Sequence, residues 1–400
     1  MLAFEEARTR LLADVPRVSA ERVTLHEASG RVLAQDLTAG DSLPPFDNSA
    51  MDGYAIATGD LGGDGPWRLA VVGESAAGRG APALPPGTAC RIFTGAPLPD
   101  RADAVVMQEH VTREGDAIGF SGRPRPWQNV RRAGEDLAAG AVALAAGTRL
   151  SPGALALAGM LDRASLEVAR RPRVTVLCTG DELRAPGDRA RPGAIPESNS
   201  APLSALARQA GASVRVAPIA GDEPHATLRA IEAALGGTDV LVTVGGVSVG
   251  DHDVVRPALE RAGVTIDFWR VAIKPGKPLA VGRSPAAHVL GLPGNPASAL
   301  VTFALFGMPL LRAMQGDARP VPLPLRVRLG ADRKRAADRL ELVRSTLTLE
   351  EGSLVARVHE NQSSGAATSL ASSDGVAFVP PGSGALAAGE LVDFVRWGDL

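Results

Sequence analysis

The sequence predicts a multidomain protein in which an α/β unit, built on a doubly wound parallel sheet, lies between two β-rich regions. A chain of 400 residues is too long for one ordinary hydrophobic core. From about residue 173 to 316, short apolar runs alternate with helical stretches, as expected for a parallel sheet covered by helices on both faces. Shorter apolar or alternating runs precede and follow this block and are typical of β-rich units.

The chain begins with a predicted helix and continues into β-rich sequence. Residues 2–14 place apolar side chains at helical spacing. From about 38 to 147 the chain is rich in Gly and Pro and has only short apolar runs, which predicts a small β-rich unit with many turns.

The α/β block contains four short apolar runs of the kind expected for parallel strands buried on both faces. They are residues 174–178, 213–219, 240–244 and 288–292. Helical stretches such as 201–210 and 226–235 separate them. Beyond residue 320 alternating runs return, and these fit either a small β-barrel or a sandwich.

Composition limits the classes of function. The net charge of −2 leaves no overall positive field to attract nucleic acid or anionic lipid. The two cysteines, Cys90 and Cys178, are too few for a disulfide framework and lack metal-ligand spacing, which predicts a reducing cytosol. The N-terminus is acidic where a secretory signal would be basic. We therefore expect a cytoplasmic protein that binds neither nucleic acid nor membranes.

Residues 289–311 carry no charged side chain and are long enough to span a membrane. The stretch contains Pro293, Gly294, Pro296 and Pro309, however. We predict a buried strand, a turn and a core helix there.

Lysine is rare in this chain. Only three of the 42 lysines and arginines are lysines, and two of them flank a Pro-Gly turn in Ala-Ile-Lys274-Pro-Gly-Lys277-Pro. An ammonium on a flexible stem suits a small tetrahedral oxyanion, whereas arginine presents a planar fork. Because Pro-Gly segments are also ordinary turns, the lysines alone leave both an anion site and chance open.

Polar residues collect where the predicted strands end, which is where open parallel sheets bind ligands. They are Asp181 and Glu182, Asp222 and Glu223, the run Gly245-Gly-Val-Ser-Val-Gly-Asp-His-Asp253, the lysine turn, and Leu292-Pro-Gly-Asn-Pro296. Thr-Gly-Asp-Glu could simply cap a helix, and the glycine run lacks the Gly-Lys-Ser/Thr ending of a P-loop. Their convergence nevertheless predicts a phosphate or oxyanion site whose carboxylates suit Mg²⁺.

A second unusual string, residues 44–55, contains Asp47, Asp52 and the only tyrosine, Tyr54. It could be no more than a polar loop that enters a strand. Thr94-Gly-Ala-Pro and Gly-Glu-Asp136 lie further along the chain. Composition alone does not join these segments to the strand ends.

Seven motifs follow one another in the order found in the MoeA family of molybdopterin molybdenumtransferases, which is related to the C-terminal domain of gephyrin. They are Pro-Phe-Asp-Asn-Ser-Ala-Met-Asp-Gly-Tyr-Ala, Thr-Gly-Ala-Pro, Gly-Glu-Asp, Thr-Gly-Asp-Glu-Leu, Gly-Gly-Val-Ser-Val-Gly-x-x-Asp, Lys-Pro-Gly-Lys-Pro and Gly-Leu-Pro-Gly-Asn-Pro. The chain resembles this family from about residue 2 to 400.

The resemblance implies an elongated homodimer with four domains per subunit, preceded by an N-terminal helix. The implied parts are an N-terminal helix on the α/β domain (1–20), an elongated linking domain (21–39 and 141–171), an inserted β-rich domain (40–140), an α/β molybdopterin-binding domain (172–320) and a C-terminal β-barrel (321–400).

The implied reaction inserts molybdate into adenylylated molybdopterin, with Mg²⁺-dependent release of AMP, and yields molybdenum cofactor. The resemblance places the active cleft between the inserted domain of one subunit and the last two domains of the other. It also allows contacts with other proteins of molybdenum cofactor biosynthesis. No cysteine nucleophile is required.

The family's functional positions match residues of this sequence. The matches that bind molybdate are Ser248, Lys274, Lys277, Arg344 and Ser364. The catalytic matches are Asp52, Glu182, Asp222 and Asp253, of which the last three are also the metal ligands. The matches that bind the rest of the substrate are Thr94, Asp136, Gly245, Gly246, Gly250, Pro293, Asn295 and Pro296.

The sequence departs from the family pattern at one place, and two alternative functions stay open. The family usually has Gln-Gly-Ser-Gly where this chain has Gln362-Ser-Ser-Gly365, so Ser363 is a rival to Ser364. The alternatives to a molybdenumtransferase are a molybdopterin adenylyltransferase, which shares the α/β domain, and a non-catalytic scaffold on the same fold.

Overall fold

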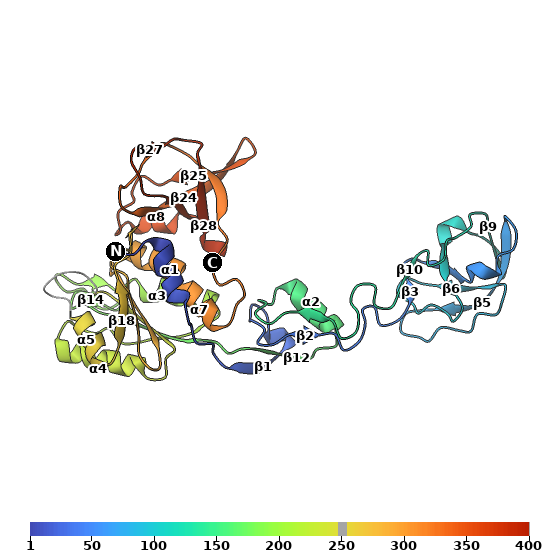
Figure 1. The fold of residues 1–400 in the computed structure, drawn as a ribbon, viewed down its shortest axis with the longest axis horizontal. Coiled ribbons are helices and arrows are strands. Elements are labelled where there is room, and N and C mark those ends of the chain that lie inside the picture. Colours follow the sequence, from blue (N-terminus) through green and yellow to red (C-terminus); the bar gives the residue numbers. More distant parts are fainter. Residues whose placement is uncertain (247–253, 400) are drawn as a thin grey trace.

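The computed structural model describes residues 1–246 and 254–399 and shows an elongated molecule (Figure 1). We name its parts by the elements they contain. They are the α/β domain (173–314), the barrel (325–396), the arm (20–38 and 142–169) and the distal domain (48–131). The α/β domain and the barrel lie together at one end, and the arm leads from them to the distal domain.

A six-stranded sheet of order β16-β13-β17-β21-β20-β18 forms the α/β domain. The strands are β13 (Arg173–Cys178), β16 (Ser213–Val216), β17 (Val240–Val244), β18 (Thr265–Trp269), β20 (Ala280–Arg283) and β21 (His288–Leu292). Only β20 runs antiparallel to its neighbours. The other five strands therefore end at one edge of the sheet, and the turn from Lys274 to Lys277, which leads from β18 to β20, follows one of these ends.

Helices cover both faces of this sheet, which confirms the doubly wound prediction. The helices are α3 (Ser200–Gln209), α4 (Pro224–Leu235), α5 (Val255–Arg261), α6 (Pro296–Thr302) and α7 (Met308–Met314), with a π-helical turn at Phe303–Gly307. Side chains alternate along a strand, so Val242 packs with α3 and α6 whereas Leu241 packs with α4 and α5.

The helix formed by Pro296–Met314 is long and apolar enough to cross a membrane by length and composition, but 89% of that stretch is buried inside the molecule. It follows β21 and the turn at residues 293–295. The predicted order of strand, turn and core helix is therefore confirmed.

The first helix, α1 (Phe4–Leu12), ties the α/β domain to the barrel. The ring of Phe4 meets those of Phe306 and Phe378 edge to face, with centroids 5.3 and 5.7 Å apart. Leu2 bridges to Val271 in the α/β domain. The helix expected in residues 2–14 is thus part of the main core.

The chain passes through the arm twice, and the distal domain is inserted between the two passes. The arm contains β1 (Ala20–Thr24) paired with β12 (Ser165–Ala169), β2 (Leu37–Thr38) paired with β11 (Val142–Leu144), and α2 (Pro152–Met160). The distal domain holds a sheet of order β7-β4-β6-β5-β9-β8. Its strands are β4 (Gly53–Ile56), β5 (Trp67–Ser75), β6 (Thr88–Ile92), β7 (Ala104–Met107), β8 (Thr112–Glu114) and β9 (Ala117–Phe120), and β3 (Asn48–Ser49) pairs separately with β10 (Val130–Arg131).

Five strands close into a ring at the C-terminal end. They are β22 (Leu325–Leu329), β24 (Leu340–Glu350), β25 (Ser353–Val358), β26 (Gly375–Val379) and β28 (Leu391–Arg396), and β24–β26 pairing completes the closure. The smaller elements are β14 (Leu183–Arg184), β15 (Ile195–Pro196), β23 (Arg333–Lys334), β27 (Ala385–Leu386) and α8 (Ala367–Ala371). The barrel implied by the resemblance is confirmed. One short strand of the α/β domain, β19 (Ile273–Lys274), runs parallel beside β24.

Candidate functional site

Three strand ends of the α/β sheet lie close together, and at Gly245 two of them, those of β13 and β17, approach so closely that a side chain would clash. The amide of Gly245, after β17, donates to the carbonyl of Leu292 at 3.1 Å. Gly245 has a φ of +99°, and a Cβ there would lie 2.6 Å from the carbonyl oxygen of Thr179. A Cβ on Gly294 would lie 3.7 Å from the Cα of Gly245. Backbone groups therefore form this part of the sheet edge, as a site that approaches an anion closely requires.

Replacing Gly245 by alanine is expected to lower both the melting temperature and the activity, because the new methyl group would force the ends of β13 and β17 apart. Gly237 is a matched control, since it also has a positive φ, +69°, but faces open space. Gly237→Ala should cost about 1 kcal/mol from left-handed strain alone. Differential scanning fluorimetry compares the two, and equal shifts would contradict the close approach.

The carboxylates at this edge lie in a reciprocal pair. The amide of Asp181 donates to Asp222 at 3.2 Å, and the amide of Asp222 donates to Asp181 at 3.1 Å. Both side chains are exposed, as is Glu182, whose carboxylate covers Gly180. We assigned no role to Asp181 from the sequence, although it stands in the same motif as Glu182.

Three of the predicted residues, Ser248, Gly250 and Asp253, lie outside the described residues. The predicted metal set Glu182, Asp222 and Asp253 therefore has two described members. Within 1–246 and 254–399, His, Cys, Asp and Glu side chains form no group of three or more that could hold a metal ion.

Lys274 and Lys277, which have equivalent places in the sequence motif, have different surroundings in the structure. Lys274 Nζ donates to Glu341 Oε1 at 2.8 Å. Lys277 is exposed and has no ion-pair partner among the described residues. Between them, Gly276 has a φ of +102°, and a Cβ there would overlap the hydroxyl of Thr302 on α6. The lysine turn thus packs directly on α6.

Arg344 is fully buried in the barrel and supports the loop that contains Ser363 and Ser364. Its Nη2 donates to the carbonyl of Ser363 at 2.8 Å, and its Nε donates to Ser369 Oγ at 3.0 Å. Burial lowers the pKa of Arg344. No carboxylate of the described chain pairs with it, and its Nη1 has no hydrogen-bond partner there. A buried cation without a counter-ion favours an anion nearby.

The turn before α6 is held from beneath by residues that sequence reasoning missed. Asn199, which is 7% exposed, donates through Nδ2 to the carbonyl of Gly294 at 2.9 Å. Glu197 accepts from the amide of Ser200 at 2.9 Å. The predicted residue Asn295 precedes α6 and Pro296 is its first residue, and the Asn295 side chain makes no capping bond. Polar residues just before a predicted helix, Glu197-Ser-Asn199, were the available signal.

Cys178 lies under the same turn and donates to Glu197 Oε1 at 3.3 Å. Burial, and then the charge of Glu197, raises the pKa of this thiol well above its usual range. Burial also raises the pKa of Cys90 in the distal domain. Neither thiol is poised as a nucleophile, because the thiolate is the reactive form.

Helix α6 is contacted by segments that carry described residues predicted to bind the oxyanion, at the junction of the α/β domain and the barrel. The amide of Ala297 donates to the carbonyl of Ser364 at 3.3 Å, and Thr302 abuts the lysine turn. These two residues are about 7–8 Å apart along the helix axis. The lysine turn, the loop held by Arg344 and the turn before α6 therefore surround one short helix.

The remaining predicted residues lie on the distal domain or, in the case of Asp136, where the arm meets it. Asp52 Oδ1 accepts from both the amide and the hydroxyl of Thr94, each at 2.8 Å. These bonds, the backbone one first, lower the pKa of Asp52. Arg91, which we did not predict, stacks over Phe93 beside this pair, 4.7 Å from the ring centroid. Asp136 is exposed and lines a cavity where the arm meets the distal domain.

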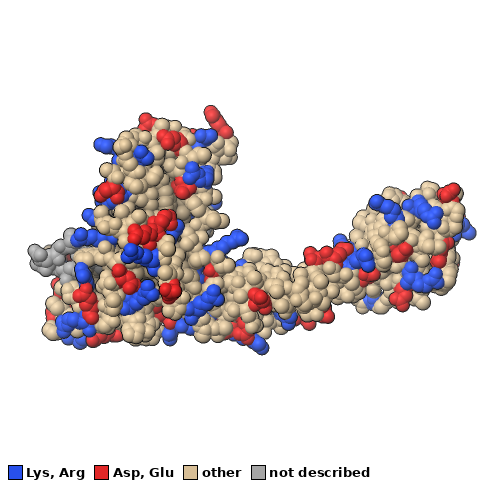
Figure 2. Space-filling view, in the orientation of Figure 1, with Lys and Arg blue, Asp and Glu red and all other residues tan. Residues whose placement is uncertain are grey.

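Figure 1 shows the distal domain at the opposite end of the arm from the α/β domain and the barrel. A single chain therefore does not bring Asp52, Thr94 and Asp136 to the helix α6 junction. On the described part of the face in Figure 2, acidic and basic side chains are interspersed, in keeping with the small net charge.

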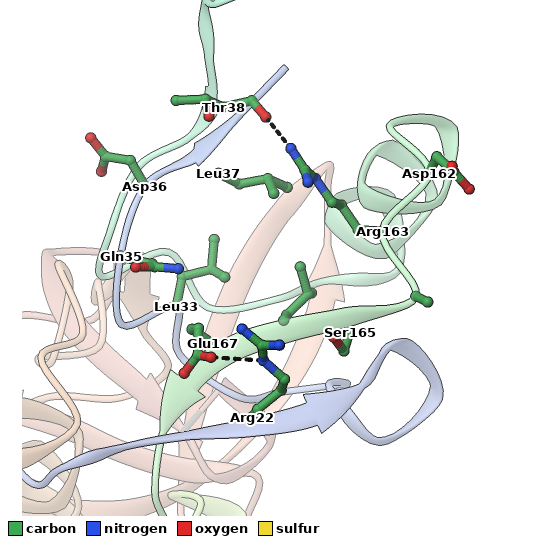
Figure 3. Close-up of a pocket in the computed structure, with 12 residues that line it drawn as sticks. Arg22, Leu33, Gln35, Asp36, Leu37, Thr38, Asp162, Arg163, Ser165 and Glu167 are labelled. Carbon is green, nitrogen blue, oxygen red and sulfur yellow. Dashed lines mark hydrogen bonds and ion pairs between the residues drawn. The ribbon is translucent and has the colours of Figure 1, made fainter. Parts of the chain in front are cut away.

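The arm has a cavity of about 410 Å³, drawn in Figure 3. Arg22 bonds Glu167 at 2.8 Å, and Arg163 bonds the carbonyl of Thr38 at 2.9 Å. None of the predicted site residues lines it.

The fold and the junction define a class of protein: an α/β ligand-binding domain joined to a C-terminal barrel and to an arm with an inserted domain. Three family models match in the same order. They are the MoeA N-terminal region (domain I and II) at residues 2–161, a probable molybdopterin binding domain at 175–313, and the MoeA C-terminal region (domain IV) at 326–397. The chain belongs to the MoeA family.

Named relatives cover most or nearly all of the chain. A molybdopterin molybdenumtransferase of Haemophilus influenzae is 41% identical over 79% of this chain and 78% of its own length. One of Synechococcus elongatus is 39% identical over 98% of this chain and 99% of its own length. The crystal structure of the molybdopterin biosynthesis MoeA protein from Pyrococcus horikoshii superimposes with a TM-score of 0.85 at 30% identity, covering 99% of this chain and all of that one.

Proposed function

We propose that this chain is a molybdopterin molybdenumtransferase, which inserts molybdate into adenylylated molybdopterin and releases AMP. The observation that carries the proposal is the gathering of the lysine turn, the Ser363–Ser364 loop and the turn before α6 around one helix. The names of relatives that match 79% and 98% of the chain support it. The adenylylated pterin would lie along the glycine turns at the sheet edge.

Each described residue of the junction has a distinct part in binding the oxyanion. Lys277 is exposed and, unlike Lys274, has no ion-pair partner among the described residues, so it would contact the oxyanion directly. Arg344 would contribute by supporting the loop that contains Ser363 and Ser364, because its guanidinium donates to the carbonyl of Ser363. Both serines are held through their backbone, Ser363 by Asn361 and Arg344 and Ser364 by the Ala297 amide, and only Ser364 is thereby bonded to α6. We therefore assign the ligand role to Ser364.

The carboxylates at the sheet edge fit a magnesium ion. Asp222 and Glu182 are exposed and offer only oxygen donors, and Mg²⁺ in phosphate sites commonly takes one or two carboxylates with phosphate oxygens and water. Glu182 and Asp222 would hold it, together with Asp253. When bound, the ion would offset the negative charge of the phosphates.

A second copy of the chain would complete the site. The distal domain, which carries Asp52 and Thr94, lies at the other end of the arm from the α/β domain and the barrel of its own chain (Figure 1), and Asp136 lies where the arm meets the distal domain. A homodimer in which the distal domain of one subunit faces the junction of its partner would bring the two sets together. A twofold dimer creates two such clefts.

An assay with two substrate mixtures tests the activity. With adenylylated molybdopterin, Mg²⁺ and molybdate, we expect AMP release and reconstitution of an apo-molybdoenzyme, both dependent on molybdate. With molybdopterin and ATP, we expect neither. Transfer of AMP from ATP to the pterin would identify an adenylyltransferase. Binding without turnover in either mixture would identify a scaffold.

A further inference from the structure

Glu341 is a buried carboxylate at the boundary between the barrel and the lysine turn. It is 4% exposed, although it belongs to a residue type that is rarely buried without a partner. Its Oε1 lies 2.8 Å from Lys274 Nζ, and its Oε2 lies 3.7 Å from Arg333 Nε. The parallel pairing of β19 with β24 sets Lys274 directly beside Glu341. The backbone therefore fixes this ion pair.

Because Glu341 pairs with Lys274, the positive charges of the two lysines at the junction are offset to different extents. Lys274 is 55% exposed in its side chain but has a carboxylate at hydrogen-bond distance, so much of its charge is offset. Lys277 has no such carboxylate among the described residues. An anion that takes Lys274 as a ligand must compete with Glu341. The second carboxylate oxygen would then face only Arg333, at 3.7 Å.

We propose that Glu341 is a positioning residue that acts through Lys274 and sets how tightly the α6 junction binds a tetrahedral oxyanion. The proposal rests on the proposed function, since it takes molybdate as the ligand. Glu341 holds the ammonium at the junction and offsets its charge, so that the site binds the oxyanion reversibly. It does not touch the substrate.

Replacing the carboxylate by an amide of the same shape is the direct test. We expect Glu341→Gln to lower the dissociation constant for molybdate about fivefold, because a unit charge close to the ligand is removed while Lys274 stays. Isothermal titration of the full-length protein with sodium molybdate measures this constant. Glu350→Gln is the matched control, because Glu350 lies on the same strand and pairs with Arg357 away from the junction. The control should leave the constant unchanged.

A double-mutant cycle keeps the test decisive if the single variant folds poorly. Lys274→Met leaves Glu341 buried without its near partner, and this should lower the melting temperature and weaken molybdate binding. Adding Glu341→Gln to Lys274→Met should restore the melting temperature and bring the dissociation constant within about twofold of the wild-type value, because the two charges are removed together.

Two results would overturn the proposal. One is a Glu341→Gln variant that folds and binds molybdate with unchanged affinity. The other is a Lys274→Met/Glu341→Gln variant that binds molybdate as weakly as Lys277→Met does. In both cases Lys277→Met tests the proposed function separately. Loss of molybdate binding in that variant supports the oxyanion site, whatever the result for Glu341.

Discussion

Replacing Lys277 by methionine is expected to lower molybdate-dependent cofactor synthesis about a hundredfold, with binding of the adenylylated pterin largely retained. Both lysines of the junction are exposed, but only Lys277 has no carboxylate partner in the described chain. Removing one donor that contacts developing or bound negative charge typically costs this much. Reconstitution of an apo-molybdoenzyme at low and high molybdate measures the effect.

The chain provides a matched control in Lys334, its third lysine, which lies on β23 of the barrel. Lys334→Met should keep full activity. Lys277→Arg separates charge from shape, and full activity in that variant would show that the ammonium is not required. The double variant Lys274→Met/Lys277→Met should also lose turnover. The single Lys277 variant is the cleaner test, because the double variant leaves Glu341 without its near partner.

Heterodimers of two inactive subunits are expected to recover about half of the wild-type activity if the cleft forms between subunits. One subunit would carry Asp52→Asn, which keeps an oxygen acceptor for Thr94, and the other would carry Lys277→Met. One of the two clefts then combines both lesions, and the other combines an intact distal domain with an intact junction. Coexpression with two affinity tags isolates the heterodimer for the cofactor assay.

The two homodimeric variants serve as controls and should both be nearly inactive. A heterodimer as inactive as these controls would place the whole site within one chain and contradict the cleft between subunits. Size-exclusion chromatography with light scattering checks the dimer directly. A monomeric wild-type protein that is fully active would contradict the same proposal.

Much of the fold could be predicted from local patterns. The apolar runs at 174–178 and 240–244 are central strands, and they are buried on both faces because α3 and α4 pack on opposite sides of the sheet. The apolar stretch at 289–311 forms a strand and a core helix, as its prolines indicated. For the C-terminal region, alternation alone could not distinguish a barrel from a sandwich. The closing pair β24–β26 is a long-range contact that periodicity does not encode.

The candidate site was predictable only in part. Strand ends and glycine turns identified the sheet edge, because parallel strands direct their carboxyl ends to one side. The supporting residues Asn199, Glu341 and Arg91 were not predicted. Each either contacts a partner that is distant in sequence or belongs to no recognisable motif. Lys274 and Glu341 are 67 positions apart.

The sequence by itself determined the class of the α/β domain, the position of the glycine turns and the presence of two lysines in one turn, because these follow from periodicity and local chemistry. Only the tertiary structure decided that the two lysines differ. The register of β19 against β24 places Glu341 beside Lys274, whereas Lys277 has no carboxylate partner among the described residues. The tertiary structure also showed that the arm keeps Asp52 away from the α6 junction of the same chain. Both results depend on how separate segments pack, and no local pattern contains that information.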